Sequence, residues 1–588
     1  MRELISIVTM VLISTVMYGK SITVKNNRPF QNQFTESNAT YVVKSCIDLD
    51  GSTLTVPDGS TLKFKRNGSI CNGEVHLSNT LLKGTIHLYC KVVGSTRNEE
   101  ILISCLDDGD GRLLEKRLES ILNLENACEI ILDKDVILSG GQLSVKRLLL
   151  RGNHRICNSP SFKVSGDVII DKVAFAEFRN KKELFIDLSG QLKPSRISLQ
   201  SVIFDCGNNI DRVIYKPVKQ ASLCSISIDN CVFQRINNYA VQFQSDCTGQ
   251  ISNCTIRDHG TNNWGHVICF HLGNNDSYNA TKLTIKNNRF SDIQVPYSKN
   301  AESREAHAIL IFGHENTISD NIVSHLFSTD NPEGDPGKDS EGIYLKGRKN
   351  MVVNNELIDC VGSGPDGAIT IKSIFADNKI AGNRIQHRFG IGIQCYTPNS
   401  RIENNQIESC HKAEAAIALC NNKSSVIDNN SLMLKEENRK SHKAAIELMS
   451  CGDITVKNNT SDSPSFVTAY SNTGNIVFET NHLTIKDKTF GTNTYYSSPI
   501  ELHSDGANYI FVGNIIDLKN VKTSQLIEAD SKFKGKVQFD ENVINVLDTE
   551  TEETTIHYLV RNISSVTKKG NQILHKKKEQ TSKLKHLL

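Results

Sequence analysis

The sequence lacks a strong charge of either sign. It carries 67 lysine and arginine residues against 65 aspartate and glutamate residues, a formal net charge of +2 over 588 residues. A chain this close to neutral gives no electrostatic reason to expect nucleic acid as a partner. Residues 566–588 are lysine-rich, and a short basic end of this kind is usually a solvated tail.

The sequence also lacks the short motifs of several large enzyme classes. It has no G-x-S-x-G nucleophile elbow, no Walker loop, no H-E-x-x-H zinc motif and no G-x-G-x-x-G run in a strand–helix–strand setting. These absences argue against serine hydrolases of the elbow type, nucleotide triphosphatases, zinc peptidases and dinucleotide-binding enzymes.

Long apolar runs are missing after the first 20 residues. Arg2 precedes an apolar run at 4–17, and Gly19 offers a small residue before Lys20, as in secretory signals. The run is too short to span a bilayer, and no cysteine near the predicted cut could accept a lipid. We therefore expect residues 1–19 to be a signal peptide. The mature protein should be secreted or periplasmic, without a membrane span, and we expect a monomer.

A disulfide scaffold is not indicated either, although the chain has 17 cysteines. The count is odd, and the spacing does not follow the pattern of small disulfide-rich domains. Several cysteines, among them Cys231, Cys254 and Cys360, lie within or just after strand-like segments. We interpret most of the cysteines as small buried apolar residues.

What the chain does have is a repeated line of sequence, in which an asparagine stands between apolar residues (apolar-x-Asn-x-x-apolar). Successive copies are separated by roughly 28 residues, with intervals that vary, and such a period indicates a repeat architecture. The copies begin at Ile228, Ile251, Ile285, Ile318, Val352, Ile380, Ile402, Ile427, Val456, Phe478, Phe511 and Phe539, with weaker ones at Ile170 and Leu199.

Variable intervals around a constant line indicate coils that carry loops of different length. Short strands and a repeated asparagine turn fit an all-β fold, the right-handed parallel β-helix. Asparagines at equivalent turns can hydrogen-bond from coil to coil. A leucine-rich repeat is the alternative solenoid, but its leucine pattern is missing.

A second strand precedes the asparagine line at a nearly constant distance, which predicts one parallel sheet along the solenoid. Its first apolar residues are Ile309, Ile343, Ile369, Ile391, Ile417 and Ile446. Residues 20–105 are rich in strands, and 111–124 has helical periodicity. We expect these segments to form a small β and helical cap at the N-terminal end, because an open first coil needs covering. Residues 106–565 would then be the catalytic β-helix.

Lysines end two neighbouring strands of the predicted sheet. Because alternate strand residues face the same side, the residues between the inward isoleucines point outward. The predicted outward column runs through Phe312, Lys346, Lys372, Gln394, Cys420 and Met449. Adjacent coils are about 4.8 Å apart, so Lys346 and Lys372 should be stacked, which lowers the pKa of at least one of them. A neutral lysine can act as a general base, although two ordinary surface lysines remain the simpler alternative.

Other polar residues gather around the same coils. His307 heads the previous strand in line with Glu341, and His387 and Arg388 fall in a predicted turn. The residues with candidate catalytic roles are Lys346 or His307 as base, and Tyr344, Lys372 or Arg388 as proton donor to the leaving group. The residues expected to contact substrate are His387, Gln394, Tyr396, His411 and the single tryptophan, Trp264.

An acidic stretch precedes the first of the two lysine-ended strands. Asp339 and Glu341 lie two residues apart, so both side chains can face one side, and oxygen ligands suit a hard cation such as calcium. The stretch has no EF-hand spacing, and a solvated acidic loop is the alternative interpretation.

In this order of segments, the sequence resembles the pectate-lyase-like β-helix superfamily. Within it, "DSEGIYLKG", "NMVVNNELIDC", "GAITIKS" and "IAGNRI" are similar to the chondroitinase B and alginate lyase type of polysaccharide lyase. The resemblance implies that Lys346 removes the proton beside a uronate carboxylate and that Asp339 and Glu341 hold a calcium ion there. It departs from that family at Lys372, where the family has arginine, and in lacking the asparagine that completes the calcium site.

The resulting hypothesis is a secreted lyase that cleaves an acidic polysaccharide by β-elimination. The expected substrates are glycosaminoglycans such as chondroitin sulfate, dermatan sulfate or hyaluronan, followed by alginate or pectin. Two alternatives stay open from the residues. One is a glycoside hydrolase on the same fold, which needs paired carboxylates. The other is a β-helix that binds carbohydrate without cleaving it.

Overall fold

The structure is a computed structural model of the chain, and it describes residues 19–26, 28–217, 223–259, 267–270, 280–294, 306–327, 340–360, 367–372, 376–434, 444–490, 498–503, 506–547, 555–561, 563 and 565–576. Residues 1–18 of the predicted signal peptide, Trp264, Asp339 and the last 12 residues of the tail lie outside the described residues.

The chain forms two compact units. The first comprises residues 1–180, 186–191 and 196–203, and the second comprises 181–185, 192–195 and 204–588. Both sides of the predicted boundary at residue 105 belong to the first unit.

The first unit consists of parallel strands with one inserted helical segment. Its elements are β1 (Ser21–Val24), η1 (Phe30–Asn32), β2 (Thr40–Val43), β3 (Cys46–Asp48), β4 (Thr53–Thr55), β5 (Thr61–Phe64), β6 (Ser69–Gly84), β7 (Leu88–Thr96), β8 (Glu100–Leu102), α2 (Ile103–Leu106), α3 (Gly111–Leu122), β9 (Glu129–Leu132), β10 (Val136–Ile137), β11 (Gln142–Val145), β12 (Leu148–Gly152), β13 (Arg155–Cys157), β14 (Ser161–Val164), β15 (Val168–Asp171) and β16 (Ala174–Ala176). Strands β1, β2, β5 and β6 pair in parallel, so residues 20–105 form stacked coils of their own.

The predicted helix at 111–124 is present as α3 and ends two residues earlier. Asp110 caps it, because its carboxylate accepts hydrogen bonds from the backbone amides of Arg112 and Leu113. Its apolar face is buried, as the periodicity requires. The buried apolar residues of α3 are Leu114, Leu118, Ile121 and Leu122.

The remaining strands continue along the solenoid to the C-terminal end. They are β17 (Lys182–Asp187), β18 (Ser195–Gln200), β19 (Ile203–Asp205), β20 (Ile210–Lys216), β21 (Cys224–Asp229), β22 (Val232–Ile236), β23 (Tyr239–Phe243), β24 (Cys247–Ser252), β25 (Thr255–His259), β26 (Ile268–Phe270), β27 (Ala280–Lys286), β28 (Arg289–Gln294), β29 (Ala306–His314), β30 (Thr317–Ser319), β31 (Ile322–Phe327), β32 (Ser340–Lys346), β33 (Met351–Val353), β34 (Glu356–Cys360), β35 (Gly367–Ile371), β36 (Lys379–Ala381), β37 (Arg384–Cys395) and β38 (Arg401–Glu403). The last strands are β39 (Gln406–Ala413), β40 (Ile417–Cys420), β41 (Val426–Asp428), β42 (Ser431–Leu434), β43 (Ala444–Met449), β44 (Gly452–Lys457), β45 (Thr460–Asp462), β46 (Ser465–Tyr470), β47 (Thr473–Glu479), β48 (His482–Thr489), β49 (Ile500–His503), β50 (Asn508–Val512), β51 (Ile515–Ala529), β52 (Lys536–Asp540), β53 (Val543–Leu547), β54 (Thr555–Arg561), β55 (Val566–Lys569) and β56 (Gln572–Lys576).

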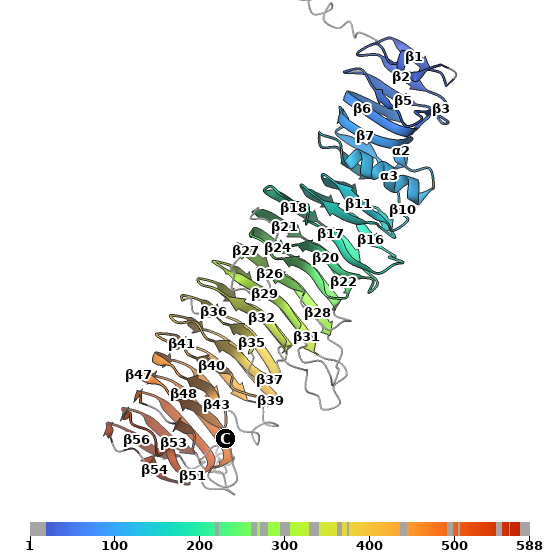
Figure 1. Cartoon of the computed structure of the whole chain (residues 1–588). Helices are drawn as coiled ribbons and strands as arrows, with labels where there is room; N and C mark the ends of the chain where they lie inside the picture. The colour runs from blue at the N-terminus through green and yellow to red at the C-terminus, as the bar shows by residue number, and fades with distance from the viewer. Residues whose placement is uncertain are drawn as a thin grey trace, which may run out of the picture. The chain divides into compact units, whose positions relative to one another are not determined.

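In the second unit each strand pairs in parallel with its equivalent on the next coil, as Figure 1 shows for the strands from β20 onward. One row of strands, which we call the site row, carries both lysines. It comprises β20, β23, β26, β29, β32, β35, β37, β40, β43, β46, β49 and β51. The predicted fold, an all-β parallel β-helix, is confirmed.

The repeated asparagine forms a continuous buried ladder in the second unit. From Asn288 onward, the side-chain amide of each ladder asparagine donates to the side-chain oxygen of the next, at 2.8 to 3.1 Å. The members are Asn288, Asn321, Asn355, Asn383, Asn405, Asn430, Asn459, Asn481, Asn514, Asn542 and Asn571. The predicted coil-to-coil bonding of asparagines is therefore confirmed.

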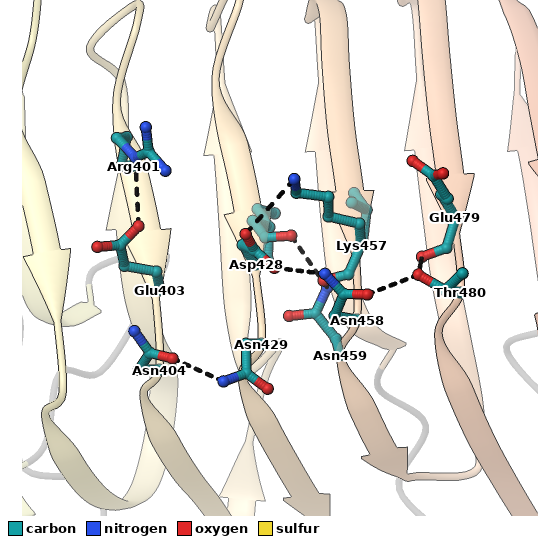
Figure 2. A network of polar contacts seen from close by, with 12 residues as sticks. Arg401, Glu403, Asn404, Asp428, Asn429, Lys457, Asn458, Asn459, Glu479 and Thr480 are labelled. Carbon is teal, nitrogen blue, oxygen red and sulfur yellow. Dashed lines mark hydrogen bonds and ion pairs between the residues drawn. The ribbon is translucent and has the colours of Figure 1, made fainter.

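The residue before each ladder asparagine makes the turn. Asn354, Asn404 and Asn458 have φ angles of 57°, 58° and 55°, a left-handed conformation that asparagine tolerates better than most residues. Their side chains extend the polar contacts along the corner: Asn429 donates to Asn404, and Asn458 donates to Asp428 (Figure 2). The doubled asparagine thus combines a turn residue with a ladder residue.

Asn355→Ala should lower the free energy of unfolding by about 3 kcal/mol, because it leaves several buried polar groups without their hydrogen-bond partners. The Asn355 side chain accepts from the backbone and side-chain amides of Asn321, and it donates to the carbonyl of Ile318. Asn354→Gly is the matched control, since residue 354 is exposed and its φ suits glycine. Chemical denaturation of both variants checks this, and equal stabilities would contradict it.

Cysteines behave largely as the sequence predicts. Twelve of those that the structure describes are buried, and four, Cys46, Cys71, Cys90 and Cys105, are exposed or half-buried. Burial raises the pKa of Cys90 and Cys128 to about 12, so both stay as neutral thiols. The interpretation of most cysteines as small apolar core residues is confirmed.

His259 should make the protein less stable in mild acid. It is buried at the end of β25, and burial lowers the pKa of its imidazole to about 3. The unfolded chain has an ordinary histidine pKa near 6.5, so it takes up the proton first and stability falls as pH drops below 6.5. The loss at pH 5.0 should be roughly 2 kcal/mol.

Thermal unfolding at pH 7.5 and pH 5.0 tests this expectation. His259→Leu should reduce the shift in midpoint between the two pH values, whereas His575→Leu, at an exposed position, should leave it unchanged. An undiminished shift in the His259→Leu variant would exclude this group as the cause.

Candidate active site on the outer face of the site row

The two lysines lie on consecutive coils. Tyr344 and Leu345 of β32 pair with Thr370 and Ile371 of β35, and the backbone amide of Lys372 donates to the carbonyl of Leu345 at 2.9 Å. The register therefore puts Lys372 beside Lys346, as the strand spacing predicts. Both side chains are half-buried.

Aromatic rings surround both ammonium groups. Lys346 Nζ lies 4.6 Å from the ring centroid of Phe312, and Lys372 Nζ lies 5.6 Å from Tyr344 and 5.7 Å from Tyr396. The Phe312 and Tyr344 rings are themselves in contact, with centroids 6.0 Å apart. Cation–π contacts of this kind hold the ammonium groups close to the aromatic side chains.

A buried histidine–carboxylate pair adjoins this cluster. His307 Nε2 lies 2.5 Å from Glu341 Oε2, and both side chains are nearly inaccessible, at 4% and 2% exposure. The His307 ring is 5.5 Å from the Tyr344 ring. Since a carboxylate at this distance fixes the orientation of an imidazole, Glu341 positions His307 against Tyr344.

A glycine explains why Glu341 faces outward. A Cβ built on Gly342 would lie 2.6 Å from Leu357 Cδ2 and 3.5 Å from Cys360 Sγ, so position 342 faces the core. Ile343 is buried as well. Two successive inward residues break the strand alternation, which leaves Glu341 on the side of Tyr344.

The predicted position of Gln394 is wrong by two residues. Gln394 pairs with Thr370, and the backbone amide of Tyr396 donates to Ile371, so Tyr396 takes the place beside Lys372. The segment "GIGIQ" contains two isoleucines that face the same side of the strand, so either could align with Ile369. In the structure Ile393, not Ile391, is the partner of Ile369. Gln394 is fully buried, which argues against direct contact with a substrate.

His387 lies at an irregular corner of β37 and its side chain is fully buried. The register of β37 shifts between His387 and Phe389, and Gly390 has a φ of 55°, so the chain changes direction where the sequence predicts a turn. The Nε2 of His387 is 2.6 Å from Ser409 Oγ. Its burial argues against the predicted contact with a substrate.

Three further predicted residues cannot be placed at the site from the described side chains. Arg388 and His411 have their backbones in β37 and β39, and their side chains are outside the described part. Trp264 lies outside the described residues altogether. Their roles stay predictions.

The described residues do not form the calcium site that the acidic pair suggests. The carboxylate of Glu341 is buried against His307, and Asp339 lies outside the described residues. Among the residues described, no group of three or more histidine, cysteine, aspartate or glutamate side chains is arranged to hold a metal ion. We therefore derive no catalytic step through calcium.

The site row also carries functional groups that the sequence reasoning missed. The column of Lys346, Lys372 and Tyr396 continues to Tyr470 and His503 on β46 and β49. His503 stacks on Tyr470, with centroids 4.9 Å apart, and its Nε2 lies 3.0 Å from Glu501 Oε2. This hydrogen bond raises the pKa of His503. Extending the column beyond Met449 to "SFVTAY" and "SPIELH" would have found these residues.

A protein-family model identifies the same architecture in part of this chain. Residues 270–461 match the family model described as right handed beta helix region. This segment is a right-handed β-helix. Because the match includes β29, β32, β35 and β37, the two lysines and the His307–Glu341 pair lie within it. The predicted resemblance to the β-helix superfamily is thus confirmed at the level of the fold.

Solved structures of similar architecture have low sequence identity to this chain. One is an Arthrobacter chlorophenolicus A6 DFA-IIIase without its lid, at 11% identity, covering 66% of this chain and 94% of that one with a TM-score of 0.32. Another is a tailspike protein mutant of E. coli bacteriophage HK620, at 12% identity, with 75% and 73% coverage and a TM-score of 0.36. A lacto-N-biosidase from Eubacterium ramulus matches at 12% identity, with 65% and 62% coverage and a TM-score of 0.29. No curated protein matches this chain.

The part of the chain that the structure describes contains no helix of sufficient length and apolar character to span a membrane.

Proposed function

We propose that this protein is a polysaccharide lyase that cleaves uronate-containing chains by β-elimination. The observation that supports this most directly is the pair of lysines on consecutive coils, each packed on aromatic rings of the site row. A cationic, aromatic surface on the outer face of a sheet suits a sugar ring that carries a carboxylate.

The reaction needs a base, a group that stabilises negative charge and a proton donor. Lys346 takes the proton at C5, and the electron pair forms the C4–C5 double bond as the C4–oxygen bond breaks. The ammonium of Lys372 stabilises the charge that develops on the carboxylate. The phenol of Tyr344 gives its proton to the departing oxygen, because Tyr344 lies between the lysines and His307. His307, held by Glu341, is the second candidate for the base.

The substrate class follows from the cations. Two lysines on one face favour a polyanion, which makes a sulfated or unsulfated glycosaminoglycan the first candidate and alginate or pectin the next. The predicted export, which would bring the protein to such polymers outside the cytoplasm, belongs to the same proposal.

A single assay tests the reaction type. The protein is incubated with chondroitin sulfate, dermatan sulfate, hyaluronan, alginate and polygalacturonate, each with added calcium or with a chelator. New absorbance near 232 nm, the signature of the unsaturated product, is the expected result for at least one polymer. Absence of that absorbance on every polymer, in both arms, would reject the lyase.

A hydrolase is the second candidate, and a specific pair of carboxylates favours it. Glu501 of β49 pairs in register with Glu528 of β51, so the two residues lie on neighbouring coils about 4.8 Å apart. A glycosidase needs two carboxyl groups close together on one surface, and adjacent coils can supply such a pair. New reducing ends without absorbance near 232 nm, abolished by Glu501→Gln, would identify this reaction instead.

A further inference from the structure

A groove in the first unit carries its own basic surface. It has a volume of about 570 Å³ between β7 and α3, within the usual size range of small-molecule binding sites. Lysines stand around it on three different elements: Lys91 on β7, Lys116 on α3 and Lys146 directly after β11. We call this cavity the α3 groove.

The positive charge of the α3 groove is only partly neutralised. Lys91 Nζ is paired with Glu74 at 2.9 Å. Lys116 and Lys146 are exposed, and neither has an ion-pair partner within the described part of the chain. The acidic side chain in the lining, Glu119, accepts a hydrogen bond from the backbone amide of Ser144 at 2.8 Å. Two ammonium groups are therefore available to a ligand.

The walls of the α3 groove are fixed before any ligand binds. Asn123, at the end of α3, donates to the carbonyl of Ser144 at 2.7 Å and accepts from the backbone amide of Lys146 at 2.8 Å. Ser120 reaches the carbonyl of Cys90 at 3.4 Å. These bonds tie α3 to the strands on both sides, so binding needs little reorganisation of the backbone.

The lining combines these cations with groups suited to sugars. Tyr89 and the partly exposed Val93 offer apolar surface, and Ser120 and Asn123 offer a hydroxyl and an amide. Tyr89 is held in place by its bond to Asp108 and by Arg117, whose guanidinium lies 4.4 Å from the ring centroid. Apolar surface with a few fixed polar groups and unpaired cations is complementary to an anionic saccharide.

We propose that the α3 groove is a second binding site for an anionic saccharide, separate from the site row. This rests on the proposed function in one respect, since it assigns the groove a segment of the same acidic polysaccharide. Carboxylate and sulfate groups share the chemistry that Lys116 and Lys146 would recognise, so the test must distinguish them.

The test uses the full-length chain with Lys346→Ala as background, so that the polymer is not consumed. Binding is measured by calorimetry with polygalacturonate, which has carboxylates only, dextran sulfate, which has sulfates only, chondroitin sulfate, which has both, and neutral dextran. Lys116→Ala combined with Lys146→Ala should weaken binding of at least one anionic polymer about fivefold to tenfold. Raising the salt concentration should also weaken binding of the anionic polymer to the chain that keeps both groove lysines.

The matched control removes two lysines of the same unit that lie away from the α3 groove. Lys44, directly after β2, and Lys63, on β5, are exposed and outside the groove lining, and Lys44→Ala with Lys63→Ala removes the same charge. The proposal would be overturned if the control and the groove variant bound the anionic polymers with equal affinity. It would also be overturned if neutral dextran bound as tightly as the anionic polymers. Groove-dependent binding without any product absorbing near 232 nm from the parent enzyme would uphold the groove and reject the lyase.

Discussion

Replacing Lys346 by alanine is expected to lower the rate of polysaccharide cleavage by roughly 10²–10⁴-fold, the range that a positioned general base contributes. Lys346→Arg should be almost as inactive, because arginine keeps the charge but does not release its proton near neutral pH. The two variants together distinguish a base from a cation that only binds substrate. Initial rates at 232 nm, with kcat and KM determined separately, provide the measurement.

The control for this prediction is Lys423→Ala, an exposed lysine beyond the end of β40. It removes the same charge from the second unit and should leave kcat unchanged. Full activity in Lys346→Ala would exclude Lys346 as the base and move the role to His307. Recovery of kcat in Lys346→Arg would show that position 346 supplies charge only.

Glu341→Leu should lower the free energy of unfolding by about 1–3 kcal/mol, the cost of removing the polar partner of a buried imidazole. His307 would then lie in a site of very low exposure without the carboxylate 2.5 Å away. The measurement is chemical denaturation of the variant and the parent at neutral pH.

The double variant His307→Leu with Glu341→Leu tests the cause. Replacing both members by apolar residues removes the unpaired buried group, so most of the lost stability should return. If the double variant is less stable than either single one, packing of the side chains rather than their pairing would account for the effect.

The fold could be predicted from the sequence because its signal is local and repeated. Most asparagine lines encode a left-handed turn residue followed by a ladder residue, as at Asn354 and Asn355, and this order recurs from coil to coil. The same reasoning predicts that Lys346 and Lys372 are neighbours, since both strands end in the same phase.

The exact positions of the site residues could not be predicted, because the sequence pattern is compatible with more than one strand register and more than one side-chain direction. "GIGIQ" allows two registers that keep the same face inward, and the structure uses Ile393. Glu341 faces outward only because Gly342 and Ile343 both face the core, which alternation does not predict. The same applies to His387, whose buried bond to Ser409 depends on the next coil.

In the asparagine ladder, the contact between neighbouring coils does not depend on the length of chain that connects them. Neighbouring ladder residues are 22 to 34 positions apart in the sequence, yet each makes the same amide contact. The chain length between them is therefore free to vary, provided that the strands and the turn keep their phase. Extra residues between two strands can alter what a coil presents to a polymer without costing core contacts. A scaffold of this kind could be given a new specificity by exchanging inserts, coil by coil, with the eleven-residue ladder left intact.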